Sequence, residues 1–462
     1  MNLPLLTDTI VAPATPPGHS ALAVVRLCGD QAYAIADSLF KGKKLSEQSP
    51  NTIHFGTLND EAGMIDEVVA SLFRKPHSYT GEDIIEFSTH GSPYVVKRMM
   101  QACMTAGARI AEPGEFTRRA FVHGKLDLSQ AEAVADLIAS ENQSQHTLAI
   151  QQMRGAYSSK IEGLRQELID FAALLELELD FSEEDIAFAD REQLFRLLNQ
   201  AEEEIQKLSH SFQIGNVMKK GIPVAIVGKP NSGKSTLLNI LLQEEKAIVS
   251  EVAGTTRDFI EDTLQLGGIT YRFIDTAGLR QTDDALEAKG IERSYEKMKQ
   301  ARLILFIADI QQPWKEIVAD VQQLTLHSDQ KLIVVLNKAD AIASTCDAYD
   351  VEEAIATSLR NPVLICSAKQ GMHIDKLLAL IEQETRLQTG FDVLISNERH
   401  WQALQEAASA LVLVREGLNE HRSGEFVALD LRMALQALGR ITGKISSEDI
   451  LGSVFSRFCI GK

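Results

Sequence analysis

The sequence predicts a multidomain protein of α/β and α parts, with an N-terminal α+β domain and a helical domain interrupted by an α/β module. Two observations predict this class. The 462 residues exceed what one hydrophobic core usually serves. Helical periodicity also appears twice, before and after a region in which strands, loops and helices alternate. The expected domain boundaries are 1–123, 124–219, 220–379 and 380–462.

Residues 1–123 combine short apolar runs with turn-rich sequences. Runs at residues 21–27 and 68–73 are separated by sequences such as Thr15-Pro16-Pro17-Gly18. This alternation is typical of strands with a few helices between them. We therefore expect an α+β domain here.

The two helical parts carry apolar residues at helical spacing. The pattern Ser129-Gln130-Ala131-Glu132 predicts a helix start, because the hydroxyl and the carboxylate can each serve a free amide. Beyond the α/β module, Leu431, Leu435 and Leu438 form one stripe. Helices on both sides of an intact module favour one helical domain with an insertion, and two separate helical domains are the alternative.

Composition limits the location and the partners of the chain. Its 46 basic and 64 acidic residues give a net charge of 46 − 64 = −18. Any nucleic-acid-binding face must therefore be local or come from a partner. The five cysteines are scattered, no apolar run reaches membrane-spanning length, and the first residues lack the basic start of a signal peptide. These features predict a cytoplasmic protein with reduced thiols.

A phosphate-binding loop is the strongest local signal. An expected strand at 222–227 runs into Gly228-Lys229-Pro230-Asn231-Ser232-Gly233-Lys234-Ser235, which matches G-x-x-x-x-G-K-S, and a helix follows. Glycines let backbone amides wrap a phosphate, and the start of the helix attracts negative charge. Lys234 is expected to reach the β- and γ-phosphates, and the Ser235 hydroxyl to ligate magnesium.

Three further motifs follow expected strands: Asp275-Thr276-Ala277-Gly278, Asn337-Lys338-Ala339-Asp340 and Ser367-Ala368-Lys369. The first can hold magnesium through water and sense the γ-phosphate. The carboxylate of the second can accept both N–H donors of guanine's edge, and the third can pack over the base. Their order and spacing are those of Ras-like GTPases, and they lie where open α/β sheets bind ligands. The sequence thus predicts a Ras-like P-loop GTPase domain that hydrolyses GTP.

The segment between the first two motifs leaves two roles open. In Ala253-Gly254-Thr255-Thr256-Arg257-Asp258, either threonine could complete the magnesium shell from a switch loop. Leu279 stands where Ras-like enzymes place the glutamine that orients the attacking water. The acids that follow it are candidates for that work: Asp283, Asp284, Glu287 and Glu292.

These motifs and their flanks resemble the MnmE (TrmE) family of bacterial tRNA-modification GTPases along the whole chain. The resemblance includes Asp8-Thr9-Ile10-Val11-Ala12, Tyr79-Thr80-Gly81-Glu82-Asp83 and the tail Phe458-Cys459-Ile460-Gly461-Lys462. It implies an N-terminal folate-binding and dimerisation domain and a helical domain interrupted by the GTPase module. An Era-like GTPase switch in ribosome assembly is the alternative, but it leaves the first domain and the tail without a role.

The resemblance implies a chemical role as well. Family members act with a flavoprotein, MnmG, which holds FAD, on the wobble uridine of certain tRNAs. They install aminomethyl or carboxymethylaminomethyl groups with a one-carbon unit from 5,10-methylene-tetrahydrofolate. By resemblance the chain would form a homodimer, and a heterotetramer with MnmG. Arg26, Glu86, Lys125 and Lys462 would contact the folate. Cys459 is a candidate for the modification chemistry, although a free cysteine is more often a small buried hydrophobic residue.

The family's GTPases are potassium-activated, which implies a metal set. Asn231 matches the potassium ligand, with Ser250, Val252 and Thr255 completing the shell through carbonyls, and Thr256 would bind magnesium with Ser235. Glu287 matches the water-orienting glutamate, so the implied catalytic residues are Glu287, Lys234 and Thr256. By resemblance, two GTPase modules would have to meet to order the switch loop. The expected GTP contacts are Asn231, Ser232, Gly233, Lys234, Ser235, Thr236, Ser250, Glu251, Val252, Ala253, Gly254, Thr255, Thr256, Asp275, Thr276, Ala277, Gly278, Asn337, Lys338, Ala339, Asp340, Ser367, Ala368 and Lys369.

Overall fold

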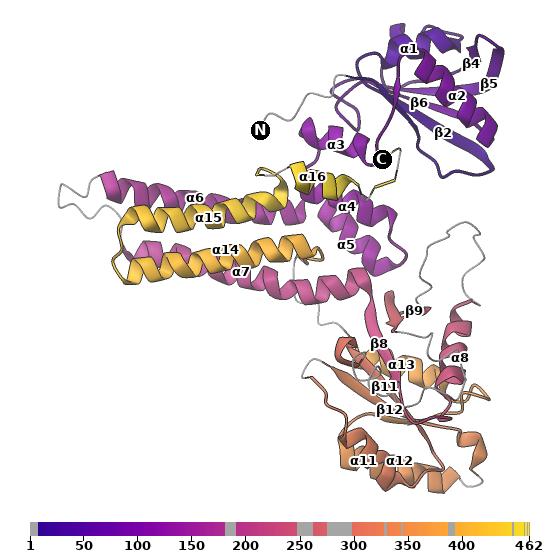
Figure 1. The fold of residues 1–462 in the computed structure, drawn as a ribbon, viewed down its shortest axis with the longest axis vertical. Coiled ribbons are helices and arrows are strands. Elements are labelled where there is room, and N and C mark those ends of the chain that lie inside the picture. The colour runs from indigo at the N-terminus through magenta and orange to yellow at the C-terminus, as the bar shows by residue number, and fades with distance from the viewer. Residues whose placement is uncertain are drawn as a thin grey trace. The chain divides into compact units, whose positions relative to one another are not determined.

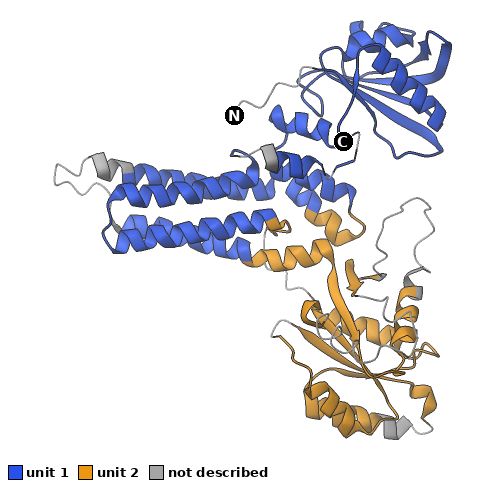
Figure 2. Ribbon diagram, in the orientation of Figure 1, with its two compact units in different colours: residues 1–139, 149–209, 399–462 blue, residues 140–148, 210–398 orange. Residues whose placement is uncertain are grey.

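A computed structural model describes residues 8–180, 191–246, 262–274, 298–327, 330–342, 345–386, 393–445, 448–456, 458–459 and 461 of the chain. It forms two compact units, coloured separately in Figure 2. The first unit contains Met1–Ala139, Ala149–Ser209 and Arg399–Lys462, and the second contains Ser140–Leu148 and His210–Glu398. Both units are therefore built from segments that are far apart in the sequence.

The first unit begins with a seven-stranded sheet in the order β3-β4-β5-β6-β2-β1-β7. Strands β2, β4, β5 and β6 of this sheet are labelled in Figure 1. All neighbouring strands are antiparallel except β1 and β7. Helices α1 and α2 share one core with this sheet, in which Tyr33 and Met99 are buried with Phe87. The predicted α+β class is confirmed. The elements are β1 (Ile10–Pro13), β2 (Ser20–Cys28), α1 (Ala32–Leu39), β3 (Phe40–Lys41), η1 (Leu45–Glu47), β4 (Ile53–Asp60), β5 (Gly63–Phe73), β6 (Ile84–Gly91), α2 (Pro93–Thr105), β7 (Arg109–Ile110) and α3 (Glu115–Val122).

The helical domain takes helices from both sides of the α/β module. They are α4 (Leu128–Ile138), α5 (Gln143–Met153), α6 (Ala156–Asp180), α7 (Arg191–Lys220), α14 (Glu398–Asn419), α15 (Gly424–Thr442) and α16 (Glu448–Phe455). Helix α15 packs along α6 (Figure 1), and Nε of Arg415 on α14 donates to Glu202 on α7 at 3.0 Å. The domain is thus a single one with an insertion, and the alternative of two separate helical domains is excluded.

The start of α4 corrects one expectation. The N-cap is Asp127, whose carboxylate accepts from the Gln130 amide at 2.8 Å, while the Gln130 side chain accepts from the Asp127 amide at 3.0 Å. These two residues form the capping box. Ser129 and Glu132, the predicted pair, lie buried inside the helix. The Asp127 and Gln130 pair and the Ser129 and Glu132 pair have the same spacing. The helix begins at the first pair, and the second pair is buried within α4.

The second unit contains a six-stranded sheet in the order β13-β12-β11-β8-β10-β9. Only β9 is antiparallel, and it pairs with β10. Helices α8 and α13 share the core on one face, and α11 and α12 share the core on the other. The elements are β8 (Ile222–Val227), α8 (Lys234–Lys246), β9 (Asp262–Leu266), β10 (Ile269–Phe273), β11 (Leu303–Asp309), α11 (Trp314–Gln322), β12 (Lys331–Asn337), η2 (Ala339–Ala341), α12 (Thr345–Leu359), β13 (Val363–Ile365) and α13 (Ile374–Glu384).

The strands expected before the four nucleotide motifs are present as β8, β10, β12 and β13. Because these strands are parallel, their carboxyl ends lie at one edge of the sheet. The loops after β8, β12 and β13 therefore gather at that edge. Within the part of the chain that the structure describes, no helix is long and apolar enough to cross a lipid bilayer.

Candidate active site

The loop between β8 and α8 has the backbone that a phosphate-binding loop requires. Gly228 has a φ of 147°, and a Cβ there would lie 2.1 Å from the Ile307 carbonyl oxygen. Gly233 has a φ of 94°, and a Cβ there would lie 2.1 Å from Nδ2 of Asn337. Both positions therefore require glycine. Asn231 adopts a φ of 59°, which asparagine tolerates better than most residues.

Helix α8 begins at Lys234, so Ser235 and Thr236 lie in its first turn, where unpaired amides attract anions. The Lys234 ammonium donates to the carbonyls of Gly228 at 3.0 Å and Lys229 at 2.7 Å. An ammonium has three N–H donors, so one remains for a phosphate oxygen. Burial lowers the pKa of Lys234. Binding an anion beside this ammonium would favour its charged form.

Asn337 joins three of the predicted motifs. Its amide nitrogen donates to the Ser232 carbonyl at 2.9 Å, and its amide oxygen accepts from the Ala368 amide at 3.0 Å. The side chain is buried, so these bonds hold the phosphate loop, the end of β12 and the loop after β13 in one arrangement. This locking role was not predicted from the sequence.

The carboxylate of Asp340 is held in place as a hydrogen-bond acceptor. The Ser367 hydroxyl donates to its Oδ1 at 2.5 Å, and this bond lowers the pKa of the carboxyl group. The carboxylate is therefore ionised at neutral pH and can accept two N–H donors from one ligand. Lys338, with a φ of 67°, pairs with Asp309 at 2.8 Å. No local pattern in the sequence predicts this partner, because Asp309 lies 29 residues upstream.

Two of the four expected folate contacts meet on the first sheet. Arg26 on β2 pairs with Glu86 on β6 at 2.7 Å, and its guanidinium lies 5.3 Å from the Phe116 ring centre and 5.7 Å from that of Tyr79. Arg26 also donates to the Gly461 carbonyl at 3.4 Å, so the C-terminal tail reaches this position. Lys125 donates to the Pro76 carbonyl at 2.9 Å instead. Lys462 lies outside the described residues.

Comparisons with known proteins cover nearly the whole chain. A family model for the MnmE helical domain matches residues 128–459, and one for the GTP-binding protein TrmE N-terminus matches residues 9–125. The tRNA modification GTPase MnmE of Cytophaga hutchinsonii is 49% identical over 463 residues, covering 99% of this chain and 98% of that protein. This chain belongs to the MnmE family. The MnmE of Flavobacterium johnsoniae is 47% identical, covering 98% of this chain and 99% of that protein.

Membership of the MnmE family and the loop geometry make the chain a P-loop GTPase. Likeness to Era is much more limited. A solved structure of Aquifex aeolicus Era bound to GDP.AlF4- is 28% identical with a TM-score of 0.29, and it covers 41% of this chain and 67% of that one. That likeness is too low to support the Era-like alternative, which also leaves the TrmE-like N-terminal part unexplained.

Several expected MnmE site residues lie outside the described residues, and their assignments stay predictions. They are Ser250, Glu251, Val252, Ala253, Gly254, Thr255, Thr256, Asp275, Thr276, Ala277, Gly278 and Glu287. Cys459 is described and exposed, and its carbonyl accepts from the Gly114 amide at 3.5 Å. The expectation that this cysteine is a small buried hydrophobic residue is therefore wrong.

Proposed function

We propose that this chain is the GTPase component of a system that modifies the wobble uridine of certain tRNAs, acting with the flavoprotein MnmG. It would install aminomethyl or carboxymethylaminomethyl groups with a folate one-carbon unit, in the cytoplasm, as a homodimer within a heterotetramer. The observation that carries the proposal is the match to MnmE relatives over nearly the full length of both chains. The Asn337 and Asp340 contacts add a site that suits guanine.

GTP hydrolysis would depend on charge placed around the phosphates. The amides of the phosphate loop and the Lys234 ammonium would hold the β- and γ-phosphates. Ser235 and Thr256 would bind Mg²⁺, with Asp275 of the Asp275–Gly278 motif acting through water. Glu287 would orient the attacking water. Hydrogen bonds to two loop carbonyls already orient the Lys234 ammonium within the phosphate loop, which supports its proposed role in binding phosphate.

A monovalent cation fits the same loop. Asn231 is exposed and adopts a left-handed conformation, so its amide oxygen is available as a ligand beside the phosphates. Carbonyls of Ser250, Val252 and Thr255 would complete a potassium site. Potassium would supply the positive charge that an arginine supplies in other GTPases. It would also explain why Leu279 is tolerated in place of a glutamine.

The Arg26 and Glu86 pair supports a folate site. The pair lies on the face of the first sheet opposite α1 and α2, beside Tyr79 and buried Phe116. An arginine can bind the glutamate tail of folate, a carboxylate can accept from its pterin edge, and aromatic rings can pack on a flat heterocycle. Lys125 and Lys462 would extend the site, and Cys459 is a candidate for the modification chemistry.

Nucleoside analysis tests the proposal. Transfer RNA from a strain lacking this chain should have lost the modified wobble uridine, and expression of the wild-type chain should restore it. A Lys234→Ala chain should fail to restore it, whereas a matched Lys315→Ala chain, changed on the outside of α11, should succeed. Wobble uridines that are unchanged in the deletion strain would refute the modification role.

A further inference from the structure

The amino ends of four neighbouring strands in the second unit each carry a basic residue. In sheet order these are Arg360 shortly before β13, Lys331 at the start of β12, Arg302 just before β11 and Lys220 just before β8. The strands are parallel, so these residues lie at one edge of the sheet, opposite the nucleotide motifs. Strands are spaced by about 4.8 Å, so the row extends over roughly 15 Å.

A fifth cation, Arg386, belongs to this basic edge. It follows Thr385, whose hydroxyl bonds to the Tyr271 hydroxyl at 2.6 Å near the start of β10. The side chains of Lys220, Lys331, Arg360 and Arg386 are exposed, and Arg302 is half-buried. Among the described residues, none of these five forms an ion pair. Each therefore has its charge available to a partner.

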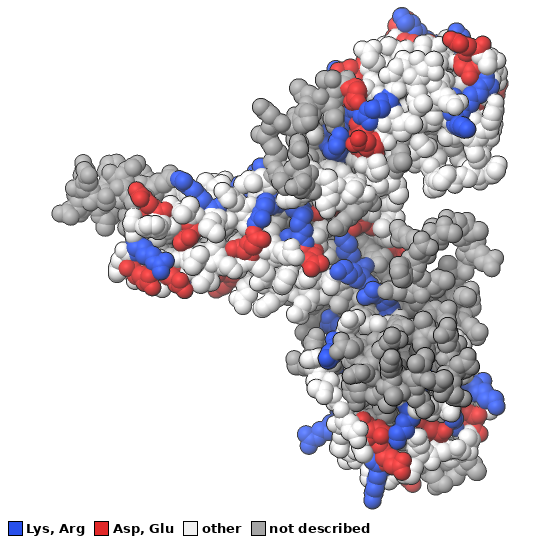
Figure 3. All heavy atoms as spheres, viewed as in Figure 1, with Lys and Arg blue, Asp and Glu red and all other residues white. Residues whose placement is uncertain are grey.

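Acidic residues are fewer at the basic edge. Glu382 and Glu384 lie in the last turn of α13, and Glu382 packs beside Gly267. Exposed Glu141 is next to Asn142, whose side chain donates to Thr270 at the start of β10. Asp329 is close in sequence but lies outside the described residues. Elsewhere on the visible surface, Lys and Arg are interspersed with Asp and Glu rather than gathered on one broad face (Figure 3). In a chain of net charge −18, five unpaired cations on one sheet edge form a local positive surface.

We propose that the basic edge binds the sugar–phosphate backbone of the tRNA substrate. Unpaired Arg and Lys side chains in a row release counterions from a polyanion, which supplies affinity without reading the sequence. A membrane surface would need apolar anchors among the cations. Of the large exposed apolar residues in the described part of the second unit, only Leu326 lies in the loops at this edge. RNA therefore fits the edge better than lipid does.

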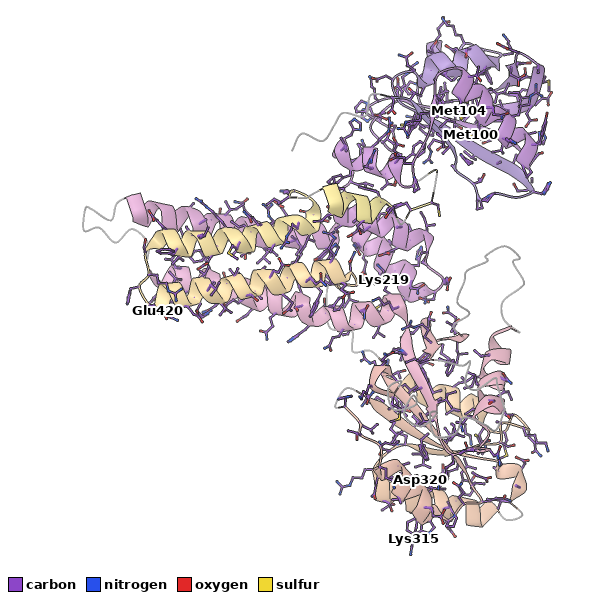
Figure 4. The ribbon with its side chains drawn as sticks, in the orientation of Figure 1. Met100, Met104, Lys219, Lys315, Asp320 and Glu420 are labelled. Atoms are coloured by element: carbon purple, nitrogen blue, oxygen red, sulfur yellow. The ribbon has the colours of Figure 1, made fainter. Side chains whose placement is uncertain are left out.

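The test uses the full-length chain and a fluorescent, unmodified tRNA transcript, with binding measured at several potassium chloride concentrations. The variant Lys331→Gln with Arg360→Gln should bind roughly tenfold more weakly, and the slope of log affinity against log salt should fall by about 2. The matched control is Lys315→Gln with Lys376→Gln. It removes two exposed lysines near the starts of α11 and α13, at the carboxyl edge of the same sheet (Lys315 is labelled in Figure 4). This control should leave the slope unchanged.

The inference rests on the proposed tRNA substrate, and the outcomes separate the two. A wild-type chain that binds no tRNA, alone or with the flavoprotein, would refute the substrate and the surface together. A wild-type chain that binds tRNA while the Lys331 and Arg360 variant keeps the full salt slope would refute the surface alone. An equal loss in the control variant, or tighter binding to anionic vesicles than to tRNA, would also overturn the surface. GTP turnover at the wild-type rate would show that the variants are folded.

Discussion

At the scale of single residues, Asp340 is the proposed determinant of which base the nucleotide site accepts. The Ser367 hydroxyl holds one carboxylate oxygen and lowers the pKa of the group, so the side chain presents acceptors only. Guanine's edge offers two neighbouring N–H donors, which such a carboxylate can satisfy together. An asparagine would offer one oxygen and one NH₂ group. One guanine donor would then face another donor.

The Asp340→Asn variant should therefore bind GTP roughly fivefold or more weakly for each donor left poorly paired. Its preference for guanine over other purines should narrow as well. Titration calorimetry with GTP, ATP and XTP measures both effects. Asp375→Asn, at the start of α13, removes an exposed acid from the same unit and should bind GTP as the wild type does. Equal GTP binding by wild type and Asp340→Asn would contradict the assigned role.

Elements of the helical domain are joined by a buried charged cluster. Arg399 and His400 at the start of α14 pair with Glu132 on α4 at 2.9 Å and 2.7 Å. Arg399 also donates to the Arg440 and Ile441 carbonyls of α15, and Tyr157 of α6 stacks on His400 at 5.1 Å. Burial alone would raise the pKa of Glu132, but His400 and Arg399 lower it to about 2. The cluster thus links four helices from both sides of the GTPase module.

Glu132→Gln should destabilise the helical domain by about 3–5 kcal/mol, because it removes the carboxylate that pairs with buried His400 and half-buried Arg399. The lowered pKa of Glu132 also determines how its contribution to stability changes with pH. Glu132 contributes its full stability above its ordinary value of 4.5 and loses it as the pH falls towards 2, so wild type and variant should converge below pH 4. Urea unfolding at pH 7 and pH 3, followed by circular dichroism, measures this. Equal midpoints at pH 7 would contradict it, and Glu406→Gln, which breaks an exposed pair with Arg440, should change little.

The elements also show where sequence reasoning reaches its limit. The boundaries of β8 were predicted to the residue, because its phosphate-loop motif is contiguous in the chain. The Glu132 and Arg399 pair joins residues 267 positions apart, and the pair of Lys229 with Asp320, at 2.6 Å, joins the phosphate loop to α11. No local pattern encodes such contacts. The folate residues could be expected only from the family resemblance, since an Arg and a Glu facing each other on neighbouring strands are usually structural.

At the scale of the whole molecule, the chain enters the GTPase module through α7 and leaves it into α14. Both helices belong in part to the helical domain, so the module is tethered at two points rather than attached as a tail. An insertion of this kind suits a GTPase whose nucleotide-dependent conformational changes are transmitted to the helical domain. It also suits the proposed requirement that two such modules, one from each protomer, meet during hydrolysis.

Replacing potassium with sodium should therefore slow GTP hydrolysis roughly tenfold or more, while GTP binding is largely kept. The reason is chemical. Leu279 cannot orient water, and the phosphate loop has no arginine. Of its two lysines, Lys229 pairs with Asp320, so Lys234 is the one expected to face the phosphates. The proposed site needs a weakly hydrated cation of potassium's size between Asn231 and the switch carbonyls.

Single-turnover rates in matched potassium and sodium chloride, at several protein concentrations, measure the effect. Potassium should also steepen the dependence on protein concentration, because two modules are proposed to pair during hydrolysis. Asn231→Ala should abolish the difference between the salts, and a wild type that hydrolyses GTP equally fast in both would remove the ion from the mechanism.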